Sequence, residues 1–159
     1  MIDQPKVCTC LWFNSQALPA AEFYCSLLPN SRIGRVGYYP EGQEMEKPGS
    51  VLTVEFTLAG TPYQALNGGP HFKLDEAVSI SISTEDQAET DHLWESLTAD
   101  GGAESECGWL KDKFGLSWQI VPKRLVALLT GPEAAKVWPA LMQMKKIEIA
   151  VLEAAANAD

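Results

Sequence analysis

The sequence has few residues that bind metals or form disulfides. Its 159 residues include only two histidines, His71 and His92, and four cysteines, at positions 8, 10, 25 and 107. Cys8 and Cys10 are separated by one residue, which is not the spacing of a zinc knuckle or a CxxC motif. So few cysteines in a chain of this length argue against a disulfide framework. No Cys or His pair has the spacing of a structural zinc site, so we expect none.

Basic residues are also scarce. There are 12 Lys and Arg against 21 Asp and Glu, which gives a net charge of -9. Nucleic acids and anionic membranes are bound by clustered Lys and Arg, so this balance argues against both partners. No apolar run approaches the ~18 residues of a membrane span, and the start MIDQPKVCTC lacks the layout of a signal peptide. We therefore expect a cytoplasmic protein.

No glycine-rich turn follows the first predicted strand. The clustered glycines are Gly68-Gly69, which precede Pro70, and Gly101-Gly102, which follow a predicted helix. Rossmann-type methyltransferases and dinucleotide-binding domains place such glycines between a strand and the following helix. The sequence therefore indicates no nucleotide-type cofactor, and we expect none.

What is present is an ordinary globular composition, with 46% hydrophobic and 21% charged residues. In the first half, residue types and alternation predict strands at 7–13, 31–39, 50–58 and 62–67. Three-to-four spacing of apolar residues predicts a helix at 17–28. The second half predicts strands at 77–83, 104–111 and 116–121 around a helix at 86–99, with Thr84 as its N-cap and Gln87 completing a capping box.

The two halves thus repeat one strand-helix-strand-strand-strand order, although their letters differ. After Pro122 we predict helices at 123–130 and 133–144, while 145–152 fits either a last strand or a further helix. The predicted fold class is α+β, with paired βαβββ modules at about 5–70 and 75–122. A helical extension at 123–159 completes a single domain, 1–159.

Each predicted sheet has one apolar face for its own helix, marked by Leu11 and Phe13 in one half and by Val78, Ile80 and Ile82 in the other. The opposite faces mix polar, aromatic and thiol side chains. Because such groups are costly to bury without partners, we expect these faces to enclose a small-molecule cavity.

Three segments resemble a known family: CLWFNSQALPAAEFYCSLLPNSRIGRV, LNGGPHFK and CGWLKDKFGLSWQIVP. They resemble the PhnB-like, or 3-demethylubiquinone-9 3-methyltransferase-like, branch of the vicinal oxygen chelate superfamily, over about residues 5–122. That superfamily includes glyoxalase I, bleomycin-resistance proteins and extradiol dioxygenases. The resemblance implies paired βαβββ modules and a homodimer.

Metal-using members of the superfamily take His, Glu or Gln ligands from the first and last strand of each module. The resemblance places Cys8, Gln64, Ala77 and Gln119 at those positions. One thiol, two neutral amides and an alanine are a poor set of ligands for a divalent metal, so we expect no metal site.

The first functional hypothesis is therefore a protein that binds a small organic molecule in a cleft between the modules without a required metal. The alternatives are a metal-dependent isomerase, lyase or dioxygenase with ligands from Glu55, His71 or Gln119, and a protein that only sequesters its ligand. Glu55 and His71 are the candidate catalytic residues. The candidate substrate-binding residues are Cys8, Trp12, Thr53, Asn67, Ser79, Trp109 and Gln119.

The extension adds apolar side chains in excess of what one helical stripe can bury: Leu125, Leu128, Leu129, Val137, Trp138, Leu141 and Met142. We expect part of this surface to contact a second chain in a homodimer.

Overall fold

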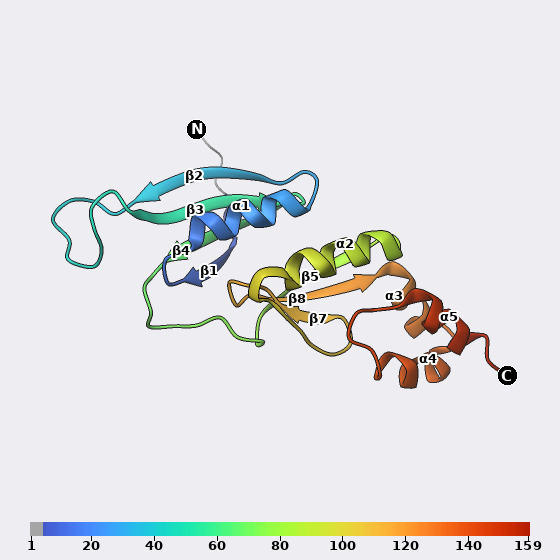
Figure 1. The fold of residues 1–159 in the computed structure, drawn as a ribbon. Coiled ribbons are helices and arrows are strands. Elements are labelled where there is room, and N and C mark those ends of the chain that lie inside the picture. Colours follow the sequence, from blue (N-terminus) through green and yellow to red (C-terminus); the bar gives the residue numbers. More distant parts are fainter. Residues whose placement is uncertain (1–4) are drawn as a thin grey trace. The chain divides into compact units, whose positions relative to one another are not determined.

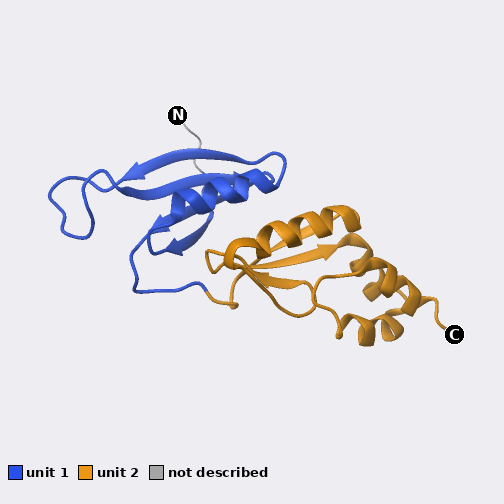
Figure 2. Cartoon of the chain, in the orientation of Figure 1, with its two compact units in different colours: residues 1–74 blue, residues 75–159 orange. Residues whose placement is uncertain are grey.

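The computed structural model describes residues 5–159, which form two compact units (Figure 1, Figure 2). The first unit ends at Leu74, and the second runs from Asp75 to Asp159. Among the described residues, no helix is long and apolar enough to cross a membrane. That the two modules act as a single domain stays a prediction.

The first unit is a βαβββ module. Its elements are β1 (Thr9–Phe13), α1 (Ala17–Leu27), β2 (Arg32–Tyr38), β3 (Val51–Leu58) and β4 (Thr61–Asn67). The strands form one sheet in the order β1-β4-β3-β2, in which β1 and β4 are parallel and the other pairs antiparallel. All five elements were predicted from the sequence, with bounds that differ by at most a few residues.

Helix α1 covers one face of this sheet and contacts β2, β3 and β4. The side chains buried between them are Leu11, Phe13, Ala17, Ala20, Ala21, Tyr24, Val54, Phe56, Leu58 and Ala65. The alternation of β1 and β3 therefore has the expected result, because every second residue of each strand is removed from water on the helix side.

The second unit repeats this module. Its elements are β5 (Ser79–Thr84), α2 (Gln87–Thr98), the 3-10 helix η1 (Ala99–Gly101), β6 (Ala103–Glu104), β7 (Trp109–Lys111) and β8 (Ser117–Pro122). The sheet order β5-β8-β7-β6 matches that of the first unit, with β5 and β8 as the parallel pair. The predicted α+β fold of paired βαβββ modules is confirmed.

Two details of the second module differ from the sequence prediction. Val78 precedes β5 and is 59% exposed, so only Ile80 and Ile82 of the predicted apolar face are buried. The predicted strand 104–111 is divided by a turn in which Cys107 and Gly108 have φ values of 54° and 85°. A strand cannot continue through two residues in the left-handed region, so β6 and β7 are separate.

The capping box of α2 uses other residues than predicted. Asp86 is the N-cap and accepts from the Glu89 amide at 2.9 Å, while the Glu89 carboxylate accepts from the Glu85 amide at 2.7 Å. Thr84 is the last residue of β5, and its hydroxyl is hydrogen-bonded to that of Thr90 at 2.7 Å. Gln87 is the first residue of α2, and its side-chain amide is hydrogen-bonded to the backbone of Ile147 and Ile149 instead.

The extension consists of α3 (Lys123–Thr130), α4 (Ala134–Leu141) and α5 (Ile149–Ala156). It has its own apolar core, made of Leu125, Leu128, Val137, Leu141, Met144, Ile147, Leu152 and Ala156. The segment 145–152 is not a strand: residues 145–148 are irregular and the rest begins α5, whose Leu152 and Ala156, four residues apart, both face this core.

The extension is fastened to the second sheet and to α2. The backbone amides of Cys107 and Gly108 donate to the carbonyls of Met144 and Lys145 at 2.9 and 2.7 Å. The Gln87 side chain donates to the Ile147 carbonyl and accepts from the Ile149 amide, at 3.0 and 2.8 Å. These long-range bonds hold the segment between α4 and α5 against the module.

Two apolar side chains, in α4 and at its C-cap, remain outside the extension's core. Trp138 is 56% exposed and Met142, four residues later, is 47% exposed.

We expect sedimentation at micromolar concentration to give about twice the chain mass of 17.4 kDa. Trp138→Gln should increase the monomer fraction, whereas Val7→Gln, a matched loss of an exposed apolar side chain, should not. A monomer at micromolar concentration would show that the predicted dimer is wrong.

Candidate functional site

The face of the first sheet that α1 leaves uncovered carries the predicted polar side chains in two rows. In one row Cys10 and Glu55 flank Gln64, and in the next Trp12 and Thr53 flank Leu66. Residues directly opposite in neighbouring strands share a face. The structure therefore brings Trp12, Thr53 and Glu55 to one surface, and Cys8 lies just before β1.

Glu55 is paired on this surface. Its carboxylate accepts from the Arg35 guanidinium at 2.6 Å, with the Glu55 side chain 26% exposed and that of Arg35 58% exposed. The Glu55 side chain is therefore partly exposed, and it lies neither in bulk water nor in a core that excludes water. Any role in proton transfer would have to operate beside a guanidinium that already binds the carboxylate.

Trp12 holds the loop that follows β4. Its indole N–H donates to the Gly69 carbonyl at 3.0 Å, and its ring meets Phe72 edge-on with centroids 4.9 Å apart. A Cβ atom on residue 68 would overlap the Trp12 ring, so glycine is the residue that permits this close approach. The loop carrying Pro70 and His71 is thereby positioned by β1.

Asn67, the last residue of β4, is 9% exposed and lies on the helix side of the sheet. Its Oδ1 accepts from the Ala17 amide at 2.8 Å, and its Nδ2 donates to the Val51 carbonyl at 3.1 Å. The Tyr39 hydroxyl donates to its backbone carbonyl at 2.6 Å. Gln16, the N-cap of α1, makes no side-chain cap hydrogen bond. Asn67, which is far away in the sequence, accepts from an amide of the first turn of α1 instead.

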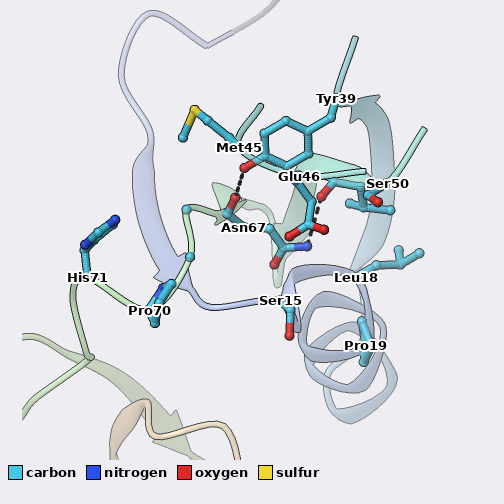
Figure 3. A pocket seen from close by; sticks show the side chains of 13 residues that line it. Ser15, Leu18, Pro19, Tyr39, Met45, Glu46, Ser50, Asn67, Pro70 and His71 are labelled. Carbon is cyan, nitrogen blue, oxygen red and sulfur yellow. Dashed lines mark hydrogen bonds between the residues drawn. The ribbon is translucent and has the colours of Figure 1, made fainter. Parts of the chain in front are cut away.

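Around Asn67 lies a pocket of about 470 Å³, here called the loop pocket (Figure 3). It is formed by the start of α1, the β2–β3 loop and the loop after β4. Its lining residues are Ser15, Leu18, Pro19, Tyr39, Met45, Glu46, Ser50, Val51, Asn67, Gly68, Gly69, Pro70 and His71. In Figure 3 the Glu46 carboxylate lies near the Asn67 amide, beside the Tyr39 ring.

The uncovered face of the second sheet carries the remaining predicted residues. Trp109 lies opposite Gln119, and the Gln119 amide donates to the Ser79 hydroxyl at 2.9 Å. Nearby, Lys111 and Glu76 form an ion pair at 2.6 Å. The hydrogen bond from Lys111 is the main reason why the pKa of Glu76 is lowered.

The predicted site residues are therefore distributed over three surfaces. Asn67 and the exposed His71 line the loop pocket, Cys8, Trp12, Thr53 and Glu55 belong to the uncovered side of the first sheet, and Ser79, Trp109 and Gln119 to that of the second. Sequence analysis missed Tyr39, Glu46 and Ser50. These residues lie in or beside a loop without periodicity, so the sequence does not indicate which way their side chains point.

The donor set of the superfamily's metal positions does not fit a divalent cation. Ala77 has no donor atom, and Gln119, whose amide nitrogen donates to Ser79, offers only one neutral amide oxygen. Among residues 5–159, no three His, Cys, Asp or Glu side chains lie close enough to share a metal ion. We therefore derive no chemistry through a metal.

Comparison with known protein families gives one match. Residues 5–121 match the family described as 3-demethylubiquinone-9 3-methyltransferase. The chain belongs to this family. The matched residues end in β8, so the family segment comprises both βαβββ modules and leaves out the helices α3, α4 and α5.

Solved structures agree with this assignment. A PhnB protein from Bacillus cereus is 30% identical, with 74% of this chain and 99% of that chain covered and a TM-score of 0.67. A protein from Pseudomonas aeruginosa is 17% identical over 75% and 98% of the two chains, with a TM-score of 0.61. The fosfomycin resistance protein FosX from Listeria monocytogenes is 16% identical over 82% and 100%, with a TM-score of 0.55.

The last two similarities concern the fold alone. No curated protein matches the sequence. The family's name mentions methyl transfer, but neither strand-to-helix turn of the structure has the glycines of a Rossmann site. Asn14, Ser15 and Gln16 connect β1 to α1, and Glu85 and Asp86 connect β5 to α2.

Asn67 offers a test of how the loop pocket is built. Asn67→Ala removes the bonds to Ala17 and Val51, and loss of a helix cap alone costs about 1 kcal/mol. We expect urea unfolding to show a loss of about 2–3 kcal/mol, because a buried carbonyl and amide are also left unpaired. Asn14→Ala, an exposed asparagine in the preceding turn, is the control and should change stability by less than about 0.5 kcal/mol. Equal stability of the two variants would contradict the structural role of Asn67.

Proposed function

We propose that this protein binds a small organic molecule and needs no metal to do so. The observation that carries the proposal is the loop pocket, whose volume of about 470 Å³ falls in the range of small-ligand sites, roughly 300–1,000 Å³. Its walls combine apolar groups with a few polar ones, and Asn67 and His71 are among them. The homodimer and the cytoplasmic location expected from the sequence belong to this proposal.

The charge of the pocket favours one ligand class. Glu46 is the only acidic residue among the lining residues, and none of them is a lysine or arginine. A carboxylate binds an ammonium group by a charge-assisted hydrogen bond, and an aromatic ring such as that of Tyr39 attracts a cation to its face. We therefore propose a ligand with an amino or ammonium group and a small apolar part, which Leu18, Met45 and Val51 would contact.

The uncovered sheet faces are the alternative location that we propose for the ligand. Cys8, Trp12 and Thr53 would contact it on the first sheet. Ser79, Trp109 and Gln119 have the same proposed role on the second sheet. Indoles supply apolar area, and hydroxyls and amides fix orientation.

Binding is favoured over catalysis by the distribution of the candidate catalytic residues. His71 lines the loop pocket, whereas Glu55 is not among its lining residues and is bound to Arg35. General acid–base catalysis needs the proton donor and acceptor within reach of one substrate. If the ligand is turned over, we propose His71 for proton transfer in the loop pocket and Glu55 for proton transfer on the uncovered sheet face.

The ligand class can be tested with benzylamine and benzyl alcohol, two probes of similar size that differ in charge. We expect calorimetric titration to show preference for benzylamine. Glu46→Gln should weaken its binding about tenfold, since a charge-assisted hydrogen bond is worth more than about 1.4 kcal/mol. Glu44→Gln removes a carboxylate from the same loop but not from the pocket, and should leave the affinity unchanged.

A second pair of variants locates the ligand without reference to its charge. Leu18→Trp should fill the pocket and abolish binding, whereas Glu55→Gln, on the uncovered face of β3, should not affect it. If Leu18→Trp leaves binding intact while Glu55→Gln weakens it, the ligand lies on the sheet face and the pocket is not the site.

The metal-free part of the proposal has its own test. Elemental analysis of the purified protein should give Zn, Fe, Ni and Mn contents well below one atom per chain, and chelator treatment should leave ligand affinity unchanged. Stoichiometric content of any of these metals would favour a metal-dependent isomerase, lyase or dioxygenase instead.

A further inference from the structure

Cys8 and Cys10 are two free, exposed thiols at the start of the first sheet. Cys10 belongs to β1, and Cys8 immediately precedes the strand. Residues two apart in an extended chain point to the same side, and Thr9 between them points to the other. The two thiols therefore share the uncovered face, away from α1.

The two thiols also influence each other's charge. Partial burial raises the pKa of the Cys10 thiol, and the charge of the nearby Cys8 raises it further. Cys25 has a pKa raised by burial alone. Among these three cysteines, only Cys8 and Cys10 are thus coupled to each other.

The strand geometry disfavours a disulfide between them. An extended chain advances about 3.3 Å per residue, which would place the Cα atoms of Cys8, just before β1, and of Cys10 about 6.6 Å apart with nearly parallel Cβ directions. A disulfide needs its Cβ atoms about 3.8 Å apart, which would require the strand to bend. A single atom bound between the two sulfurs bridges a longer gap, because it adds two bonds of about 2.3 Å, the length of a typical metal–thiolate bond.

We infer that Cys8 and Cys10 form a dithiol site for a thiophilic metal or metalloid centre, such as Cu(I) or trivalent arsenic. Thiolates are soft ligands that select such centres over Mg, Ca and Mn. Two sulfurs suffice for a centre of low coordination number, so no third side chain is required. This site is separate from the loop pocket and does not depend on the proposed function.

Phenylarsine oxide is a direct probe of the pair. Its reaction with two thiols forms two As–S bonds, and both thiol protons leave with the arsenic-bound oxygen as one water, without change of oxidation state. A single thiol adds instead with no loss of water. The intact mass of the reduced protein therefore distinguishes a two-sulfur adduct from a one-sulfur adduct.

We expect one two-sulfur adduct per chain, resistant to excess glutathione and removed by a small dithiol. Cys8→Ser and Cys10→Ser should each abolish it, whereas the double variant Cys25→Ser with Cys107→Ser should keep it. A further control, Thr9→Cys combined with Cys10→Thr, keeps the number of thiols but directs the pair to opposite faces, and should lose the two-sulfur adduct.

Retention of the two-sulfur adduct in either single variant, or its absence from the wild-type protein, would overturn the inference. Circular dichroism of each variant should match wild type, because Cys8, Thr9 and Cys10 are exposed and Cys25 and Cys107 are replaced by a side chain of nearly the same size. Prior loading with one equivalent of Cu(I) decides between the two occupants. Protection from the arsenical assigns the pair to copper, and lack of protection assigns it to a trivalent metalloid.

Discussion

Each βαβββ module has one α-helix to cover a sheet of four strands, so its own residues bury only one face of that sheet. The apolar half of every strand is used on the helix side, where Leu11, Phe56, Ile82 and Trp118 are almost fully buried. The polar side chains on the uncovered face must then find hydrogen-bond or ion-pair partners on that same face. The ion pair of Glu55 with Arg35 and the hydrogen bond of Gln119 with Ser79 are results of that constraint.

In the first unit, two side chains connect most of the elements around the loop pocket. Asn67 connects α1, β3 and β4, with Tyr39 bound to its carbonyl, and Trp12 fastens the following loop from the other side of the sheet. Both act across more than 15 residues of sequence. Together they define the floor and rim of the loop pocket, so a change in either would alter both stability and the shape of the pocket.

The extension is stabilised in a different way from the modules. It lies beyond the family segment and has a core of its own, yet it is held to the module by Gln87 and by two backbone bonds at Cys107 and Gly108. These bonds join residues that are far apart in the sequence, and Cys107 and Val121 of the module also pack against the extension's core. Trp138 and Met142 remain exposed, which is unusual for side chains of this size and agrees with a role in self-association.

The strands, both module helices and the family followed from the sequence, because clean alternation and three-to-four spacing reflect one-sided burial. The direction of Asn67 did not follow: β4 has Ala65 on one face and Leu66 on the other, so its pattern marks neither as the core side. The loop pocket was equally hidden. Its walls come from loops without periodicity, and their paths depend on long-range hydrogen bonds from Tyr39 and Trp12, which only the tertiary structure decides.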